Sequence, residues 1–225
     1  MGTADNRSQP DFARTLISMR TRVKICGVTR LEDALVACNA GADALGFIFF
    51  ASSPRNIEIE AARTIAQALP AFVTTVGLFV DPDREMVERA RDSVPLDLLQ
   101  FHGNEDPQFC EQFGAPYIKA VRVRPEVNLL ECARRFKCAR GLLLDSYVRG
   151  TKGGTGERFD WTLIPGKLPL PIVLSGGLDP ENVGAGIRAI RPWAVDVCSG
   201  VEATKGVKDP ARILAFMTGV RNADA

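Results

Sequence analysis

Short apolar runs alternate with helix-like segments eight times between Val23 and Val220. Regular alternation of this kind predicts a parallel sheet whose strands are joined by helices. Eight such units in about 200 residues match the lower end of the size range of a (β/α)₈ barrel. The sequence therefore predicts an α/β fold with a single (β/α)₈ barrel. Strands are expected over residues 23–26, 44–50, 74–80, 98–101, 117–123, 141–144, 172–175 and 194–198.

A doubly wound sheet is the main alternative to the barrel. Such a fold has fewer strands and usually carries a glycine-rich fingerprint after the first one. Here Cys26-Gly27-Val28-Thr29 follows the first strand, which does not fit G-x-G-x-x-G. No linker or change in composition divides the chain after residue 23. We expect a flexible N-terminal extension over residues 1–20 and one barrel domain over residues 21–225.

Several helices carry recognisable end signals. Thr29 and Glu32 fit a capping box, and Gly41 is placed to end the same helix. Leu31, Leu35 and Cys38 are the expected apolar stripe of this helix. Asp81-Pro82 is expected to be the cap of a later helix. Further helices are expected over residues 58–69, 82–93, 107–113, 127–137, 181–190 and 210–220, with one helical turn over 159–163.

Charge, histidine and cysteine usage exclude several functions. The net charge is +1, from 28 Lys and Arg against 27 Asp and Glu, so we expect neither a nucleic-acid nor a membrane partner. The chain has one histidine, His102, which excludes a multi-histidine zinc site. Its six cysteines include no C-x-x-C motif. Scattered cysteines without a secretory segment indicate reduced thiols and a cytoplasmic protein.

Active sites of (β/α)₈ barrels gather at the C-terminal ends of the strands. The loops after strands seven and eight of such barrels often bind phosphate through backbone N–H groups. Here these loops contain Ser175-Gly176-Gly177 and Ser199-Gly200, and glycine lets a ligand approach the backbone closely. We therefore expect a phosphorylated small-molecule ligand. The stretch from Gly150 to Gly156 lacks the ending of a P-loop and is interpreted as a mobile lid over strand six. Other polar residues at predicted strand ends or in the loops that follow them are Cys26, Arg55, Asp81, His102, Arg122, Asp145 and Asp196.

Together these segments resemble one family, the phosphoribosylanthranilate isomerases of tryptophan biosynthesis. The resemblance extends in order from residue 23 to 209, and each short motif is weak alone while the combination is specific. The matching segments are Lys24-Ile25-Cys26-Gly27 with Thr29, Gly46-Phe47, Ser53-Pro54-Arg55, Val76-Gly77-Leu78-Phe79-Val80, Gln100-Phe101-His102-Gly103, Leu143-Leu144-Asp145, Gly153-Gly154-Thr155-Gly156 with Phe159-Asp160-Trp161, Leu174-Ser175-Gly176-Gly177-Leu178 with Glu181-Asn182-Val183, and Val195-Asp196-Val197 with Ser199-Gly200-Val201-Glu202.

The resemblance implies an Amadori rearrangement by general acid–base catalysis that needs neither metal nor cofactor. It implies that Cys26 is the general base and Asp145 the general acid. Arg55 would hold the carboxylate of the anthranilate moiety, and a bidentate contact suits arginine. His102 and Asp196 are the further expected substrate-binding residues. Residues Ser175, Gly176, Gly177, Ser199 and Gly200 are expected to bind the phosphate.

Two alternatives remain open at this stage. An isomerase of the histidine pathway has a similar reaction but uses two aspartates, whereas the first strand here ends in Cys26. A non-catalytic regulatory barrel would bind a phosphosugar but would lack an acid or a base. The sequence also departs from the family at Cys198, where the family often has serine. The oligomeric state is expected to be a monomer or a homodimer.

Overall fold

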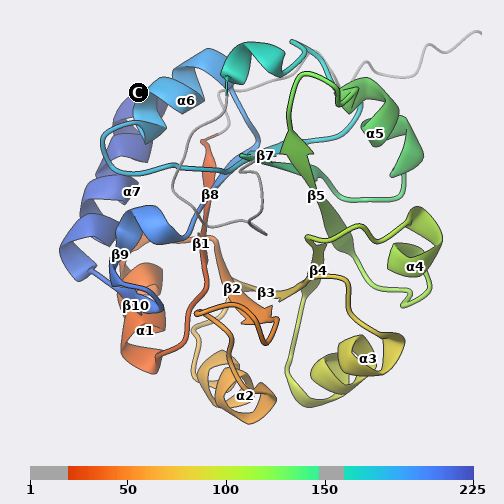
Figure 1. The fold of residues 1–225 in the computed structure, drawn as a ribbon. Coiled ribbons are helices and arrows are strands. Elements are labelled where there is room, and N and C mark those ends of the chain that lie inside the picture. The colour runs from red at the N-terminus through yellow and green to blue at the C-terminus, as the bar shows by residue number, and fades with distance from the viewer. Residues whose placement is uncertain (1–19, 147–159) are drawn as a thin grey trace, which may run out of the picture.

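The structure is a closed barrel of eight parallel strands surrounded by helices (Figure 1). It is a computed structural model that describes residues 20–146 and 160–225. The predicted single (β/α)₈ barrel is therefore confirmed. Apart from Arg20, the predicted N-terminal extension lies outside the described residues, and so does the predicted lid over Gly150–Gly156.

Each strand of the barrel pairs with its neighbour in chain order, and β8 returns to β1. The closing pair aligns Ile25 with Val197, so the ends of β1 and β8 lie side by side. The eight strands agree with the predicted runs to within two residues at each end. They are β1 (Arg22–Cys26), β2 (Ala44–Phe49), β3 (Thr74–Phe79), β4 (Leu98–Phe101), β5 (Tyr117–Val123), β6 (Leu142–Ser146), β7 (Ile172–Leu174) and β8 (Ala194–Val197).

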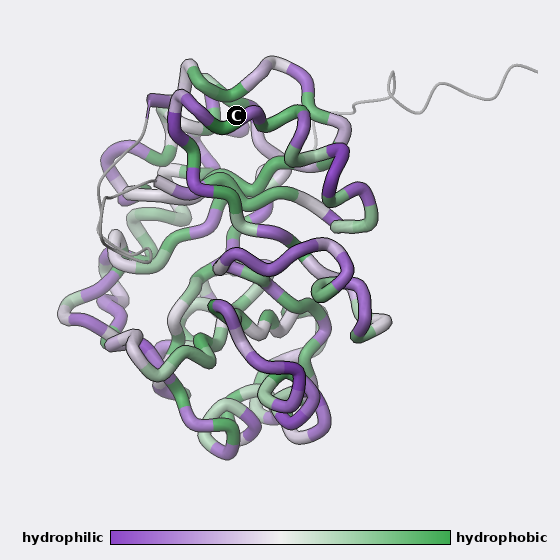
Figure 2. Tube along the Cα trace, turned by 45° about the vertical axis from the view of Figure 1, so that its right-hand side comes forward, coloured by the Kyte–Doolittle hydropathy of each residue, from purple (hydrophilic) through white to green (hydrophobic). Residues whose placement is uncertain are grey.

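The helices form a ring outside the barrel (Figure 1). Hydrophobic residues line the strands inside the molecule, while hydrophilic ones lie mostly on outward-facing helices and loops (Figure 2). Short 3₁₀ helices cover Trp161–Leu163 and Ser199–Val201. The α-helices are α1 (Leu31–Ala40), α2 (Ile59–Gln67), α3 (Arg84–Ser93), α4 (Pro107–Glu111), α5 (Leu129–Arg135), α6 (Val183–Ile190) and α7 (Pro210–Asp224).

Side chains that alternate along the strands divide the core into two parts. Outward-facing residues such as Phe47, Phe79 and Phe101 are fully buried beneath the helices. Inward-facing residues such as Ile118, Leu143 and Val173 fill the lower part of the barrel with apolar atoms. This packed floor leaves the upper layers of the barrel, at the C-terminal ends of the strands, for polar groups.

The predicted capping of the first helix is wrong. The cap position is Arg30, and no side chain caps the helix. Thr29 instead donates its hydroxyl to the carbonyl of Gly206 at 2.6 Å. The predicted apolar stripe is also wrong for Leu31 and Leu35, while its third member, Cys38, is half-buried and packs against the core. The buried face consists of alanines together with Asp33, because small residues let α1 pack closely; Leu31 and Leu35 are exposed. Gly41 does end the helix, with a left-handed φ of 97°.

Two further features of the loops differ from the prediction. Asp83 caps α3 by accepting from Met86 N at 2.7 Å, whereas Asp81 accepts from the backbone of Asn104. A short antiparallel hairpin, β9 (Glu202–Thr204) and β10 (Val207–Lys208), follows β8 and was not predicted. Its strands are too short to give an alternating pattern. Within the described residues, no helix is long and apolar enough to cross a membrane.

Candidate active site

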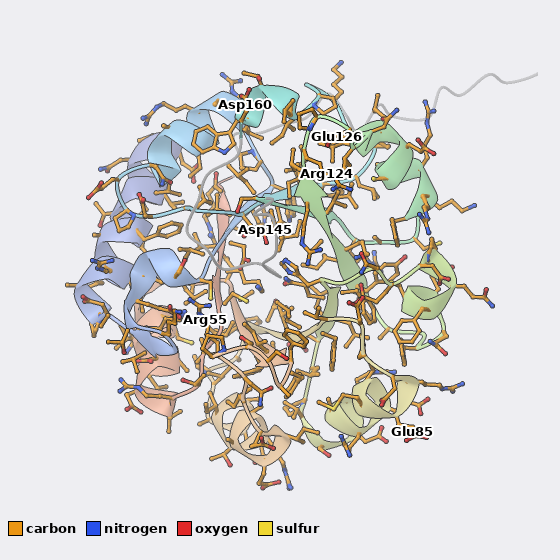
Figure 3. All side chains as sticks on the ribbon, viewed as in Figure 1. Arg55, Glu85, Arg124, Glu126, Asp145 and Asp160 are labelled. Atoms are coloured by element: carbon orange, nitrogen blue, oxygen red, sulfur yellow. The ribbon has the colours of Figure 1, made fainter. Side chains whose placement is uncertain are left out.

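The C-terminal ends of the strands bring the two predicted catalytic residues to one mouth of the barrel. Cys26 is the last residue of β1, and Asp145 is the penultimate residue of β6. Both are buried, at 3% and 5% exposure. Asp145 lies close to the barrel axis, while Arg55 lies off the axis toward β9 and β10 (Figure 3).

Cys26 lies beside a second cysteine. The register of β1 with β8 places Cys198 next to it, and the two thiols are hydrogen-bonded. A thiol that donates to Cys26, together with the nearby Lys24 ammonium, lowers the pKa of Cys26 to about 6 against the effect of burial. The same hydrogen bond and burial raise the pKa of Cys198 well above its ordinary value. These opposite shifts favour a thiolate on Cys26 and a neutral thiol on Cys198.

A buried ion pair lies on the barrel interior beside Cys26. Lys24 Nζ donates to Asp196 Oδ1 at 2.7 Å, and Ser175 Oγ donates to Asp196 Oδ2 at 3.2 Å. A side chain at Gly46, on the neighbouring strand, would meet Cys26 Sγ at 2.8 Å and Lys24 Nζ at 3.1 Å. Glycine at this position therefore gives the thiol and the ammonium a common space. Asp196 and the hydroxyl of Ser175 are engaged with each other in this layer.

Asp145 is held by one side chain and one backbone group. Its Oδ2 lies 2.9 Å from His102 Nε2, and its Oδ1 accepts from Ser146 N at 2.9 Å. Gln100 Nε2 lies 3.0 Å from the other ring nitrogen of His102. When Gln100 donates to Nδ1, the proton of a neutral imidazole is on Nε2 and points at Asp145. His102 therefore contacts the candidate acid directly.

Arg55 is buried and makes a bidentate ion pair. Its Nε and Nη2 each donate to a carboxylate oxygen of Glu202 at 2.7 Å. Lys208 Nζ contacts the same carboxylate at 3.1 Å and the carbonyl of Cys198 at 3.0 Å. A guanidinium has five N–H donors, and these two bonds to Glu202 leave both donors of Nη1 and one of Nη2 without a side-chain partner among the described residues. Gly27 has a φ of 67°, and a side chain there would meet both Arg55 Cδ and Cys198 Sγ at 2.9 Å.

The loops after β7 and β8 are in close contact. A side chain at Gly200 would clash with Leu178 O in the loop after β7, and one at Gly176 would clash with Ser146 N at the end of β6. Gly176 and Gly177 also have left-handed φ values of 80° and 68°. Glycine is thus required here for packing and backbone conformation as well as for ligand approach. A pocket of ≈ 420 Å³ between these loops is lined by Gly177, Leu178, Asp179, Pro180, Glu181, Ser199, Gly200 and Arg212.

The structure groups the predicted residues into three neighbouring sets. Arg55 shares the base side of the mouth with Cys26, and His102 lies on the acid side with Asp145. Ser199, Gly200 and Gly177 line the pocket between the last two loops. Ser175 differs, because its hydroxyl points into the barrel at Asp196 and leaves only its backbone for a phosphate.

Four functional candidates in the structure have no role in the sequence prediction. Three of them, Lys24, Lys208 and Arg212, are cations. The fourth is Glu202, the carboxylate that pairs with Lys208. The sequence could have indicated Lys24, because residues two apart in a strand point to the same face and Lys24 lies two residues before Cys26. The other three lie after β8, where chain order gives no distance to the mouth. Arg122, at the end of β5, donates to the carbonyl of His102 at 3.4 Å and has a buried Nε without a partner in the described part of the chain.

The described residues hold no group of three or more His, Cys, Asp or Glu side chains arranged for a metal ion. The chain matches a family profile described as N-(5'phosphoribosyl)anthranilate (PRA) isomerase over residues 23–218. It is 56% identical over 200 residues to the N-(5'-phosphoribosyl)anthranilate isomerase of Thiobacillus denitrificans, covering 89% of this chain and 98% of that one. It is 56% identical over 202 residues to the Pseudomonas putida protein of the same name, covering 90% and 98%.

Solved structures give the same result. The phosphoribosyl anthranilate isomerase from Thermus thermophilus superposes with a TM-score of 0.81 at 39% identity, covering 90% of this chain and 99% of that one. A phosphoribosyl anthranilate isomerase in complex with reduced 1-(o-carboxyphenylamino)-1-deoxyribulose 5-phosphate has a TM-score of 0.79 at 41% identity, with the same coverage.

Proposed function

The chain belongs to the N-(5'-phosphoribosyl)anthranilate isomerase family, and from this premise we propose that Cys26 is its general base and Asp145 its general acid. The protein is an isomerase of tryptophan biosynthesis. It converts N-(5-phosphoribosyl)anthranilate to 1-(2-carboxyphenylamino)-1-deoxyribulose 5-phosphate. The alternative of a non-catalytic barrel has no support from these relatives. The observation that carries the assignment is the placement of an ionised Cys26 and a histidine-bound Asp145 at one mouth.

The first step uses the acid. Protonated Asp145 gives its proton to the furanose ring oxygen as the bond from that oxygen to C1′ breaks. The nitrogen lone pair forms the C1′–N double bond of a Schiff base. His102, 2.9 Å from Asp145, is positioned to orient the carboxyl group and to exchange a proton with it between turnovers.

The second step uses the base. The Cys26 thiolate removes the proton from C2′, and the electron pair moves toward the nitrogen to give an enolamine. The enol then loses its hydroxyl proton as C1′ gains one, which gives the ketone product. Cys26 releases the proton that it took and Asp145 regains one through solvent before the next turnover. A pKa of about 6 for Cys26 means that most of this thiol is ionised at neutral pH, so the base is present before substrate binds.

The proposed binding contacts are assigned to the carboxylate, the ribose and the phosphate of the substrate in turn. The free edge of the Arg55 guanidinium is proposed to take the anthranilate carboxylate, and Asp196 a ribose hydroxyl. The phosphate is proposed to bind backbone N–H groups of Gly176, Gly177, Ser199 and Gly200, with the backbone of Ser175 beside them. Two left-handed glycines in the first of these loops direct successive N–H groups to one side, which is typical of anion sites.

The partner, assembly and location of the protein complete the proposal. Its partner is this phosphorylated small molecule, with no nucleic acid or membrane involved. A monomer or a homodimer is proposed, and one similar structure is described as that of monomers generated from a dimeric isomerase of Thermotoga maritima. All six cysteines are unpaired, which supports a reducing, cytoplasmic location.

Loss of substrate fluorescence on adding purified protein to phosphoribosylanthranilate measures the activity. The assignment of roles is tested with Cys26→Ser and Asp145→Asn in the same assay, alongside the binding of product. Both variants are expected to bind product and to lose turnover. Normal turnover in either variant would remove that residue from the mechanism, while leaving the family membership unchanged.

A further inference from the structure

We propose that Lys24 is a positioning residue that holds the negative charge of the Cys26–Cys198 thiol pair on Cys26. Two hydrogen-bonded thiols with one proton between them can carry the charge on either sulfur. Only a thiolate on Cys26 lies where the proposed function needs a base, so the catalytic meaning of this inference rests on that function. What the structure must supply is a reason for the charge to lie on one sulfur.

The first part of the argument is the geometry around Gly46. A single point, the Cβ position that Gly46 lacks, lies 2.8 Å from Cys26 Sγ and 3.1 Å from both Lys24 Cε and Lys24 Nζ. The ammonium and the thiol therefore occupy the same small volume over one glycine, within the distance at which opposite charges stabilise each other strongly. Cys198 Sγ lies over the next residue, 2.9 Å from the Cβ position that Gly27 lacks.

The second part is the charge balance around the two sulfurs. The groups that face the pair come from four elements: Lys24 on β1, Arg55 from the loop after β2, Asp196 on β8, and Glu202 and Lys208 on the β9–β10 hairpin. Arg55 and Lys208 share the carboxylate of Glu202, and Lys24 pairs with Asp196. Three cations and two carboxylates leave one positive charge, which a single thiolate neutralises.

The third part is burial. The side chain of Lys24 is 6% exposed and that of Asp196 is 5% exposed. Although burial opposes a charge on Lys24, Asp196 and Cys26 together hold the pKa of its ammonium above the ordinary value. A charge fixed in a water-poor site acts on its neighbour with little screening. Lys24 is therefore a permanent cation beside Cys26. Lys208 contacts Cys198 Sγ at 3.8 Å, but it shares the carboxylate of Glu202 with Arg55, so the excess positive charge lies on the Cys26 side.

Site-specific alkylation tests this directly. Full-length protein and the variants Lys24→Met, Asp196→Asn and Lys24→Met/Asp196→Asn are treated with limiting iodoacetamide between pH 5 and 9. Mass spectrometry then measures alkylation of the Cys26 and Cys198 peptides separately. We expect Lys24→Met to slow alkylation of Cys26 at pH 7 about tenfold or more and to raise the share of Cys198. Lys24→Arg keeps the charge and is expected to restore the preference for Cys26.

The order of the variants separates electrostatics from simple disruption. Asp196 opposes the Cys26 thiolate, so Asp196→Asn is expected to speed alkylation of Cys26 at pH 5. The double variant is expected to fall between wild type and Lys24→Met. If Lys24→Met does not fold, as judged by near-ultraviolet circular dichroism, Asp196→Asn against the double variant gives the same comparison, because neither of these variants leaves the Asp196 carboxylate buried without its cation.

An equal Cys26 share in Asp196→Asn and in the double variant would overturn the inference. The readout does not depend on turnover, so it separates from the test of the proposed function. Active Cys26→Ser with the expected alkylation order would remove Cys26 as the base and leave Lys24 as the group that ionises it. Inactive Cys26→Ser together with unchanged alkylation of Cys26 in the Lys24 variants would keep Cys26 as the base and remove Lys24 as the group that ionises it.

Discussion

Arg55 and Glu202 form a buried, bidentate ion pair at the rim of the barrel mouth, with both N–O distances at 2.7 Å. Glu202 is the first residue of the β9–β10 hairpin that follows β8, so this ion pair connects the loop after β2 to that hairpin. For the proposed role of Arg55, it leaves the Nη1 edge of the guanidinium to meet the substrate. Arg55 is thus both a structural residue and a candidate ligand, and the two roles use different N–H donors.

The two roles of Arg55 predict different effects for its own substitution and that of its partner. Arg55→Ala is expected to raise KM for the natural substrate about 10–100-fold, the usual range for loss of charged hydrogen bonds. A substrate analogue without the carboxylate should lose little. Glu202→Gln is the matched control: it should keep the preference for the carboxylate while lowering the free energy of unfolding by about 3–5 kcal/mol. Equal losses for analogue and substrate in Arg55→Ala would place Arg55 elsewhere in the mechanism.

Asp145→Asn tests the acid. The amide keeps the shape of the side chain and can still contact His102, but it has no proton to give to the ring oxygen. We expect kcat to fall about 10²–10⁴-fold, the usual contribution of a positioned acid, with product binding nearly unchanged. Steady-state kinetics and product titration provide both measurements. Turnover close to wild type would show that another group protonates the ring.

The sequence was sufficient for the barrel because burial on both faces gives each strand a continuous apolar run. Cys26 and Asp145 were found for the same reason, since each follows such a run and must point into the mouth. The motifs of the resembling family then supplied their roles. Helix details were less predictable: Thr29 has the right chemistry for a cap, but a carbonyl of a distant hairpin takes its hydroxyl.

The contacts that tune the site were beyond sequence reasoning. Arg55 and Glu202 are 147 residues apart in the chain, and Lys24 and Asp196 are 172 apart. Only closure of the barrel brings such pairs together, and no local pattern encodes their partners. The position of Cys198 beside Cys26 likewise depends on closure of the barrel. The sequence shows only that Cys198 stands where the family often has serine, and the β1–β8 register places this residue against Cys26.

Gly46→Ala tests the space that the base and its cation share. The added methyl group would lie 2.8 Å from Cys26 Sγ, so the thiol, Lys24 or both must move. We expect kcat to fall about tenfold or more, because displacement of a reacting group by an ångström is costly. Gly166→Ala is the control, since among the described residues no heavy atom beyond its two chain neighbours lies within 4 Å of the position it would fill. Unchanged kcat in Gly46→Ala would show that neither group depends on this contact.

Arg212→Ala tests the phosphate end of the site. Arg212, at the start of α7, lines the pocket between the loops after β7 and β8, next to Ser199 and Gly200. Its guanidinium is half exposed and 3.9 Å from Asp209, so it remains available to an anion. We expect KM to rise about tenfold with little change in kcat. Arg84→Ala, on the outward-facing α3, should leave both constants unchanged. The same KM in both variants would exclude a role for Arg212 in binding phosphate.

The Cys198 variants test the pH dependence of the base. The thiol of Cys198 donates to Cys26, which together with Lys24 lowers the Cys26 pKa to about 6. Because the base acts as a thiolate, kcat/KM should rise with pH through about 6 and level off above it. Cys198→Ala removes a donor that favours the charged form, so it should raise the Cys26 pKa and move this acid limb to higher pH. Cys198→Ser keeps a donor at nearly the same place and should move the limb little. Cys26→Ser should have almost no turnover at any of these pH values, because a serine hydroxyl is far less acidic than a thiol. Initial rates at a fixed low substrate concentration from pH 5 to 9 give the pH profiles of the wild type and of these variants.

An acid limb that stays in place in Cys198→Ala would show that the hydrogen bond between the cysteines does not set the ionisation of Cys26. Loss of activity in Cys198→Ser with survival of Cys26→Ser would exchange the roles of the two residues.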